Sequence, residues 1–368
     1  MGKLRIKTVF YSVLPSPYQR DLFYALSQLS QISLTVFYLE SAYWDSPWPQ
    51  APLRSYESVL PGFDLRWGNA RFHINWHRPP RPEADAIVFN GYTNAIAQAV
   101  LRRQSDRVPC LFWGEQQSEI ARGLQGQLTA WLRAPLQNCR AIAAIGSAAA
   151  YDYRQCFPDK PVFNIPYYCN LAPFQMAIPE RPRQPPTTLF CGQMIPRKGI
   201  DLLLRAFERV TQRGLEARLL LVGREAELPQ MLPQLAEQAR QRVEYAGFQA
   251  PEDLPHFFRR ADVFVLPSRY DGWGVVVNQA VGAGLPAICS DAVGAARDLI
   301  EPGRNGAIVP AGDVEALTEQ LAHYLQSPGA IQAASAHAQR QARVWSPEAG
   351  AQRWLEALQA VTQPPSAA

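Results

Sequence analysis

The sequence predicts an α/β fold with two doubly wound, Rossmann-like domains, each built on a parallel sheet. Three observations support this fold class. The chain has 368 residues, which is too long for one ordinary core and suits two. Short apolar segments alternate with stretches of helical spacing in both halves, and this alternation is typical of parallel sheets covered on both faces. A proline-rich segment, 179–186, separates the halves because it can continue neither a helix nor a central strand.

The first half, residues 1–180, is predicted to form the N-terminal domain. Its expected strands are 32–38, 86–89, 110–113 and 141–145. The segment that starts at Lys3 superficially resembles a secretion signal, but its apolar part is short and no small-residue cleavage site follows, so a first strand explains it better. A proline-containing turn then precedes a helix opening at Tyr18. Ser16 and Arg20 in this region either approach an acceptor or a phosphate, or simply belong to a stiff turn.

The second half, residues 187–345, is predicted to form the C-terminal domain. Its expected strands are 188–190, 218–222, 243–245, 263–266 and 287–289. The final segment, 346–368, begins with a Ser-Pro helix cap and carries an apolar stripe. It either crosses back to the first domain or packs on the second. Ligands of such sheets bind beyond the carboxyl ends of the strands, so the two domains are expected to face a central cleft.

Composition excludes several classes of protein. With 47% hydrophobic and 18% charged residues the chain is a folded globular protein. The first 179 residues hold 17 Lys and Arg against 12 Asp and Glu, an excess too small and too dispersed for a nucleic-acid partner but compatible with an anionic surface. Six scattered cysteines predict free thiols in a reducing compartment. No apolar run is long enough to span a membrane, so we expect a cytoplasmic protein whose only membrane contact is peripheral, at the inner face of the plasma membrane.

The most informative stretch of the chain is 267–280. A buried strand, 263–266, runs into a glycine-punctuated turn and then a helix. Backbone N–H groups and the positive helix end in such a turn favour an anion, most simply a phosphate. The carboxylate of Asp271, just before the turn, would accept hydrogen bonds from sugar hydroxyls. Phosphate and polyol together predict a nucleotide sugar, and the alternative is that the glycines serve only tight packing of strand and helix.

Several blocks in the second half resemble the retaining glycosyltransferases of family 4, known as glycosyl transferases group 1, which have the two-domain GT-B fold. The blocks fall in the order of the family, within residues 188–313, and they are 191–201, 245–248, 267–280, 282–288, 291–294 and 303–306. For the first half the resemblance is thin and depends mainly on the order of elements. The resemblance implies an enzyme with a nucleotide-sugar donor.

The resemblance also implies roles for single residues. In similar enzymes the lysine at the position of Lys198 contacts the two phosphates of the donor and stabilises the departing charge, together with an arginine five residues earlier. Here that earlier position is Gln193, a weaker donor than a guanidinium. Arg197 is the candidate substitute for it, and the alternative is that Arg197 is only a solvated surface charge.

Two more family positions are altered in this chain. The signature turn of the family has two acidic residues eight positions apart, one on the sugar hydroxyls and one on the ribose, and here these are Asp271 and Gln279. An amide in place of the second carboxylate would cost about 1 kcal/mol of donor binding. A histidine after the fourth strand of the first domain is replaced by Glu115, which either orients the acceptor hydroxyl or is an ordinary surface glutamate.

The expected catalytic residues are therefore Lys198, Asp271 and Glu115. The expected donor-binding residues share the loops and the helix start of the second half, and they are Gly192, Gln193, Arg197, Lys198, Phe248, Gly272, Trp273, Gly274, Val275 and Gln279. No metal or other cofactor is expected, because basic side chains and helix ends stabilise the pyrophosphate in similar enzymes and the five histidines are dispersed.

The predicted function is a retaining hexosyltransferase. It would move a hexose from a donor such as UDP-hexose or GDP-hexose to a glycan or lipid-linked acceptor, in the synthesis of cell-envelope polysaccharide or glycolipid. Because Gln193, Gln279 and Glu115 depart from the family pattern, the alternative is a sugar-nucleotide or glycan binding protein on the same scaffold that has lost turnover.

Two further segments of the first half have two interpretations each. Residues 41–82 are rich in aromatics and proline, and they either bind a glycan or glycolipid acceptor or fill a satellite core under a long loop. Residues 120–132 contain an apolar stripe with Leu128 and Trp131, near Arg122 and Arg133. This stripe belongs either to an interfacial membrane helix or to an ordinary core helix.

Overall fold

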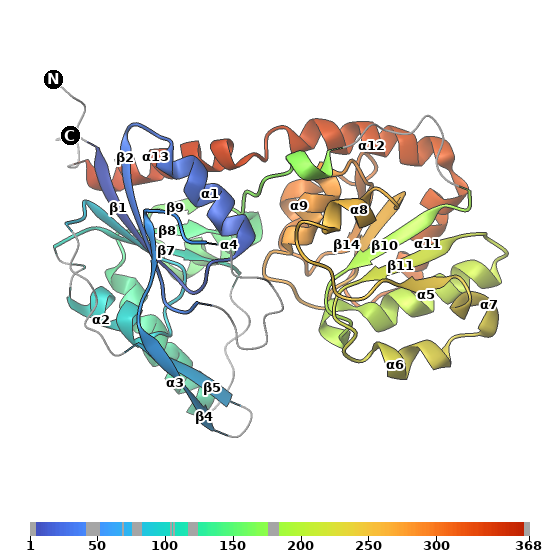
Figure 1. The fold of residues 1–368 in the computed structure, drawn as a ribbon, viewed down its shortest axis with the longest axis horizontal. Helices are drawn as coiled ribbons and strands as arrows, with labels where there is room; N and C mark the ends of the chain where they lie inside the picture. The colour runs from blue at the N-terminus through green and yellow to red at the C-terminus, as the bar shows by residue number, and fades with distance from the viewer. Residues whose placement is uncertain are drawn as a thin grey trace. The chain divides into compact units, whose positions relative to one another are not determined.

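The computed structural model describes residues 5–41, 52–67, 70–75, 83–103, 105, 107–116, 124–175 and 184–363 (Figure 1). The chain divides into two compact units, one made of Met1–Tyr168 with Pro347–Ala368 and the other of Cys169–Ser346. Each unit contains a parallel sheet with helices packed against it. The predicted α/β class with two Rossmann-like domains is therefore confirmed. Residues 179–183 of the proline-rich segment lie outside the described residues.

The sheet of the first unit has the order β3-β2-β1-β6-β7-β8-β9, with parallel pairing throughout. Its strands are β1 (Ile6–Ser12), β2 (Ile32–Tyr38), β3 (Glu57–Val59), β6 (Ala86–Phe89), β7 (Cys110–Gly114), β8 (Ala141–Ala144) and β9 (Val162–Asn164). Its helices are α1 (Pro17–Ser27), α2 (Ala95–Arg103), α3 (Leu124–Arg133) and α4 (Ser147–Cys156). The strand order reverses between β1 and β6, and such a reversal opens a crevice at the carboxyl ends of the two strands.

A hairpin projects from the aromatic segment of this unit. It consists of β4 (Gly62–Trp67) and β5 (Ala70–Asn75), which pair antiparallel. The segment 41–82 is therefore not one long loop. Four of its aromatic residues, Tyr43, Trp44, Trp48 and Trp76, lie outside the described residues. His73 lies on β5, and its Nδ1 is 2.8 Å from Asp64 Oδ1 on β4.

The last helix, α13 (Pro347–Thr362), lies in the first unit and packs on α1. Its Trp354 is completely buried. The Trp354 ring centroid lies 5.1 Å from that of Phe10 on β1 and 5.4 Å from that of Trp113 on β7. In the sequence, α13 is separated from the strands of this sheet by the whole second unit. It nevertheless supplies a central side chain of the first unit's core.

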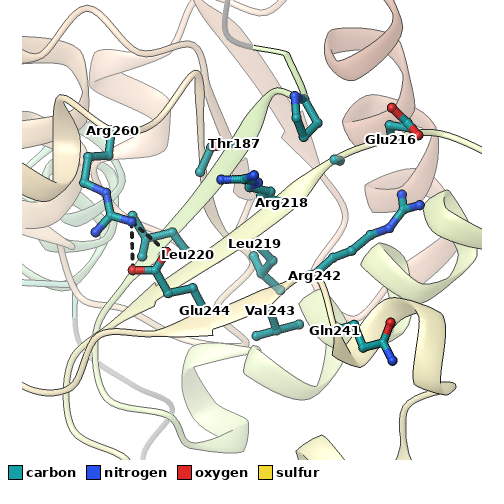
Figure 2. Close-up of a pocket in the computed structure, with 12 residues that line it drawn as sticks. Thr187, Glu216, Arg218, Leu219, Leu220, Gln241, Arg242, Val243, Glu244 and Arg260 are labelled. Carbon is teal, nitrogen blue, oxygen red and sulfur yellow. Dashed lines mark hydrogen bonds and ion pairs between the residues drawn. The ribbon is translucent and has the colours of Figure 1, made fainter.

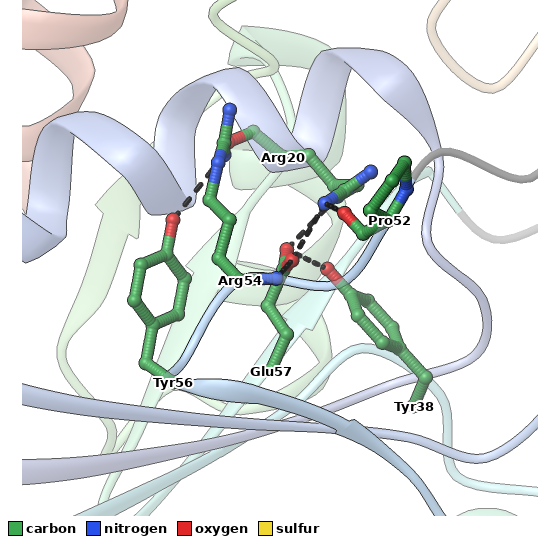
Figure 3. Close-up of polar contacts among 6 residues, drawn as sticks. All are labelled: Arg20, Tyr38, Pro52, Arg54, Tyr56 and Glu57. Carbon is green, nitrogen blue, oxygen red and sulfur yellow. Dashed lines mark hydrogen bonds and ion pairs between the residues drawn. The ribbon is translucent and has the colours of Figure 1, made fainter.

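A buried ion pair joins α1 to β3 (Figure 3). Arg20 donates through Nε and Nη2 to the two carboxylate oxygens of Glu57, at 3.0 and 2.7 Å, and the hydroxyl of Tyr38 donates to the same carboxylate at 2.8 Å. Burial acts to raise the pKa of Glu57, but hydrogen bonds from Arg20, from the Arg54 N–H and from Tyr38 outweigh it and lower that pKa overall. Arg20 therefore holds Glu57 in the fold, and its guanidinium is not aimed at an acceptor or a phosphate.

The sheet of the second unit has the order β12-β11-β10-β13-β14-β15, again parallel throughout. Its strands are β10 (Thr187–Cys191), β11 (Arg218–Val222), β12 (Val243–Tyr245), β13 (Val263–Leu266), β14 (Ala287–Ser290) and β15 (Gly306–Val309). Its longer helices are α5 (Ile200–Gln212), α9 (Val275–Gly282), α11 (Val314–Gln326) and α12 (Pro328–Ala342). The order reverses between β10 and β13, which places the loops after these two strands side by side.

All six cysteines carry free thiols. Among the described helices, none is both long enough and apolar enough to cross a membrane.

Candidate functional site

The candidate site lies at the carboxyl edge of the second sheet, where the strand order reverses. The loop after β10 carries Lys198, and the loop after β13 carries Asp271. Lys198 Nζ donates a hydrogen bond to Asp271 Oδ2, and the two side chains are only 18% and 11% exposed. The fold thus brings together two of the three expected catalytic residues.

Further contacts hold these two loops together around the pair. The guanidinium of Arg269 donates to both carboxylate oxygens of Asp201, at 2.7 Å each. The N–H of Arg269 donates to the carbonyl of Arg197 at 2.8 Å, and the Arg197 guanidinium donates to the carbonyl of Tyr270 at 3.0 Å. Burial acts to raise the pKa of Asp201, but the bonds from Arg269 outweigh it and lower that pKa. Arg197 is exposed and has a structural contact in addition to the phosphate contact expected of it.

The approach of the two loops requires a glycine beside the lysine. Gly199 has φ of +73°, and a Cβ atom placed there would lie 2.0 Å from the carbonyl oxygen of Pro267. Only glycine adopts this conformation and leaves this space without strain. The Lys-Gly pair in the sequence therefore serves the close contact of the β10 and β13 loops.

The turn before α9 is held by backbone hydrogen bonds to the loop after β14. The N–H of Asp271 donates to Ala292 O at 3.0 Å, and the N–H of Ala295 donates to Trp273 O at 2.8 Å. The Trp273 side chain is 1% exposed, and its Nε1 donates to Asn278 Oδ1 at 2.9 Å. Trp273, expected as a donor-binding residue, can therefore offer a ligand only its backbone.

Gly274 caps α9 with φ of +91°. The first N–H groups of a helix have no carbonyl partner within the helix, and they carry the positive end of its dipole. Gln279 is half-buried on α9, one turn after Val275 and on the same face. A phosphate at the start of α9 and a group bound by Gln279 would therefore be neighbours.

The remaining expected donor-binding residues lie at the same edge of the sheet. Gly192 and Gln193 directly follow β10, and Gln193 is exposed. Phe248 follows β12 and is 38% exposed. The edge therefore combines a cation, a carboxylate, a helix start and an exposed aromatic ring, which is a set suited to a diphosphate, a sugar and a base.

Sequence reasoning missed the loop after β11, which begins with Gly223 and Arg224. A Cβ atom at Gly223 would lie 1.9 Å from Gly192 O, and the N–H of Met194 donates to Arg224 O at 3.0 Å. Arg224 is thus a half-buried cation on the loop that adjoins the Lys198 loop. The signal that could have revealed it is a glycine directly after the buried strand 218–222.

Glu115, the third expected catalytic residue, belongs to the first unit. It follows β7, and its carbonyl accepts a hydrogen bond from the Tyr153 hydroxyl at 3.0 Å. Tyr167 is buried near it: burial first, and then the negative charge of Glu115, raise the pKa of Tyr167 well above its ordinary value. Glu115 therefore lies at the carboxyl edge of the first sheet.

A chain of polar side chains runs along this first edge, where the order of the strands reverses. Ser12 Oγ donates to Gln19 Oε1 at 2.9 Å, and Gln19 Nε2 donates to Asn90 Oδ1 at 3.1 Å. Asn90 Nδ2 in turn donates to Trp113 O at 3.2 Å. Gln19 and Asn90 were missed by sequence reasoning because neither lies in a motif.

A cavity of about 600 Å³ lies in the second unit, but at the opposite edge of the sheet (Figure 2). It is lined by the first residues of β10, β11 and β12, among them Thr187, Arg218 and Val243. Arg260 on its wall donates twice to Glu244, at 2.7 and 2.6 Å. Because ligands of parallel sheets bind at the carboxyl ends of the strands, this cavity is not the predicted site.

Within the described parts of the chain, no group of three or more His, Cys, Asp and Glu side chains is placed to hold a metal ion.

Known proteins resemble this chain in sequence. A sequence model described as glycosyl transferases group 1 matches residues 185–327. O-antigen chain mannosyltransferase B of Escherichia coli is 30% identical over 161 residues, which are 43% of this chain and 42% of that protein. A GDP-mannose-dependent monoacylated alpha-(1-6)-phosphatidylinositol monomannoside mannosyltransferase of Corynebacterium glutamicum is 31% identical over 178 residues, 46% of this chain and 45% of that protein. The chain spans less than half the length of these curated relatives.

Solved structures resemble the whole chain in fold. Sucrose-phosphate synthase from Thermosynechococcus elongatus has a TM-score of 0.72 at 19% identity, over 97% of this chain and 99% of that one. The lipopolysaccharide outer core galactosyltransferase WaaB has a TM-score of 0.69 at 14% identity, over 96% of this chain and 99% of that one. At such identities the likeness shows the fold alone. Residues 185–327 thus match the glycosyl transferases group 1 family model, and the two Rossmann-like domains have the GT-B fold of the solved glycosyltransferases.

Proposed function

We propose that this protein is a retaining hexosyltransferase that moves a hexose from a nucleotide-diphosphate sugar to a glycan or lipid-linked acceptor. The observation that carries the proposal is the contact of Lys198 with Asp271 beside the start of α9. A cation and a helix start suit a diphosphate, and an adjoining carboxylate suits sugar hydroxyls. The match of residues 185–327 to the glycosyl transferases group 1 family model supports this proposal.

The proposed reaction is a front-face displacement. The bond between the anomeric carbon and the donor phosphate oxygen breaks, and the acceptor oxygen forms its new bond on the same face of the sugar. The departing phosphate oxygen takes the proton of the acceptor hydroxyl, so the charges balance. Lys198 and the first amides of α9, at Gly274 and Val275, stabilise the negative charge on the departing diphosphate.

The two carboxylates have different proposed tasks. Asp271 accepts hydrogen bonds from the hydroxyls of the transferred sugar, and while it does so it also keeps the Lys198 ammonium in place. Glu115, at the edge of the first sheet, orients the acceptor hydroxyl. Since Lys198 and the helix start already supply positive charge at the diphosphate, we propose that no divalent metal is required, and transfer should continue unchanged in excess EDTA.

GDP-mannose is the proposed donor to test first. Several sequence relatives are named as mannosyltransferases, and one of them is named as GDP-mannose-dependent with a phosphatidylinositol mannoside as acceptor. The names of these relatives also support a role in cell-envelope polysaccharide or glycolipid synthesis, which we propose takes place in the cytoplasm.

The test uses the purified full chain with GDP-mannose, UDP-glucose and UDP-galactose in turn. Nucleotide release is followed with and without a mannoside acceptor, and the configuration of the new bond is read by NMR. Lys198→Ala should lower turnover by about 10²-fold or more, whereas Arg304→Ala, an exposed site in the same domain, should leave it unchanged. An inverted product, or equal turnover in Lys198→Ala, contradicts the proposal.

A second candidate function is supported by Gln193 and Gln279, which replace charged residues of the family pattern. This candidate is a sugar-nucleotide binding protein without turnover. It predicts that nucleotide sugars raise the melting temperature while no donor is hydrolysed or transferred.

A further inference from the structure

Helix α3 of the first domain exposes two large apolar side chains. Leu128 and Trp131 are each 58% exposed, and their spacing of three residues places them on one face of the helix. The interpretation of these two residues as part of a core helix is therefore wrong. Two large apolar residues side by side on a helix face require a partner if they are to be shielded from water.

Arginines adjoin this apolar pair. The Arg102 guanidinium carbon lies 4.8 Å from the centre of the Trp131 ring, and its neighbour Arg103 is exposed at the end of α2. Helices α2 and α3 contain three arginines and no acidic residue. We call Leu128, Trp131, Arg102 and Arg103 together the Trp131 surface.

Helix α3 is anchored from its inner side. Gln98 Nε2 on α2 donates to Leu132 O at 2.7 Å, and Arg133 Nε donates to the Tyr92 hydroxyl at 3.0 Å. These contacts do not involve the side chains of Leu128 or Trp131. The Trp131 surface is therefore held by polar contacts behind it, and its apolar residues can be replaced without removing those contacts.

We propose that the Trp131 surface docks the protein on an anionic membrane. Tryptophan and leucine on a helix face enter the boundary between headgroups and acyl chains. Arginines beside them reach lipid phosphates with their charged ends while their stems stay on the apolar surface. The absence of acidic residues on both helices fits a negatively charged partner. A second copy of this chain fits less well, because pairing the surface with itself would bring like charges together.

The proposal does not depend on the transferase assignment, and its test measures membrane binding alone. The full chain is sedimented with vesicles of phosphatidylcholine, or of equal parts phosphatidylcholine and phosphatidylglycerol, at low and at high salt. The wild type should bind the anionic vesicles, release them as salt rises, and bind the neutral vesicles at least about tenfold more weakly, since each arginine contributes about fivefold near such a surface.

Two variants and two matched controls locate the contact. Leu128→Ser with Trp131→Ser, and Arg102→Glu with Arg103→Glu, should each lower the fraction bound by about tenfold. The first control is Leu65→Ser, which removes an apolar side chain 49% exposed on β4. The second is Arg140→Glu with Arg154→Glu, which makes the same charge change at exposed sites outside α2 and α3. Both controls should bind as the wild type does.

Several outcomes overturn the proposal. The proposal is overturned if the wild type stays in the supernatant with anionic vesicles. It is also overturned if the two controls lose as much binding as the Trp131 surface variants. A wild type that is dimeric by light scattering, becomes monomeric on Leu128→Ser with Trp131→Ser and does not bind vesicles would assign the surface to self-association instead. Melting temperatures of all variants verify that each one is folded.

Discussion

Lys198 and Asp271 are 73 positions apart in the chain, and yet the ammonium of the first donates directly to the carboxylate of the second. They meet because β10 and β13 are neighbours in the sheet although β11 and β12 come between them in the sequence. The pair lies where the order of the strands reverses. It links Lys198, which is expected to bind the diphosphate, to Asp271, which is expected to bind the sugar. A double-mutant cycle can measure the energetic coupling between the two residues.

If the pair acts as a unit, the effects of removing its members should not multiply. Lys198→Ala and Asp271→Asn should each lower kcat/KM by about 10² or more, and the double variant should be close to the slower single variant. The measurement is steady-state transfer with the best donor for the four proteins of the cycle. Losses that multiply in the double variant would mean that the two residues act independently.

Arg269 should act as a positioning residue for this pair. It ties the β13 loop to Asp201 through two parallel hydrogen bonds, a geometry that lysine cannot reproduce. Arg269→Lys and Asp201→Asn should each lower kcat by about tenfold with little change in melting temperature, because the bridge is partly exposed. Combining the two should add no further loss. A normal kcat with a lowered melting temperature would show a role in stability only.

Gln279→Glu should improve donor binding. If the side chain at this position faces the ribose, a carboxylate accepts from both hydroxyls more strongly than an amide, by about 1 kcal/mol or about fivefold in Kd. Calorimetry with the nucleoside diphosphate measures the change. Gln279→Met, which has similar length and no acceptor, is the matched control and should bind more weakly than the wild type. Equal affinities in all three proteins would remove Gln279 from the site.

The Glu57 cluster should make stability depend on pH in the acid range. The pKa of Glu57 is lower in the folded state than its ordinary value of 4.5, so its contribution is fully present above that ordinary value. It is lost as the pH falls through the lower, folded-state pKa. Urea unfolding should therefore show that Glu57→Gln costs about 3–5 kcal/mol at pH 7, since it leaves Arg20 unpaired, and that the difference from wild type shrinks in acid. If the difference between Glu57→Gln and the wild type grew in acid, the folded state would not lower the pKa of Glu57.

Trp354→Ala should destabilise the first domain by about 3–5 kcal/mol, because it empties a fully buried site among aromatic rings. Trp131→Ala is the matched control, since that tryptophan is 58% exposed, and it should change stability by less than about 0.5 kcal/mol. Urea unfolding followed by far-UV circular dichroism measures both. Similar losses in the two variants would count against the packing of α13 on the first sheet.

The sequence predicted the features whose signals are local. Apolar runs of strand length marked β10, β11 and β13, and the glycine turn before α9 marked the start of a helix. From the sequence alone, Arg269 is indistinguishable from a solvated surface charge. Its ion pair with Asp201 forms only because the fold brings two distant loops together. Trp131 fits a core stripe equally well, because periodicity reports which residues share a face and not what covers that face. The sequence left open whether Arg20 contacts a phosphate, because its partner Glu57 is 37 positions away and comes close only in the fold.

The place of α13 in the first domain has a consequence for biosynthesis. A ribosome makes the chain from its N-terminus, so every strand of the first sheet leaves the exit tunnel long before Trp354 is translated. During that interval the hydrophobic space beside Phe10 and Trp113 has no permanent occupant, and the second domain, whose residues form one continuous stretch, can finish folding first. The nascent N-terminal domain is therefore the part of this protein that should depend most on chaperones until translation ends.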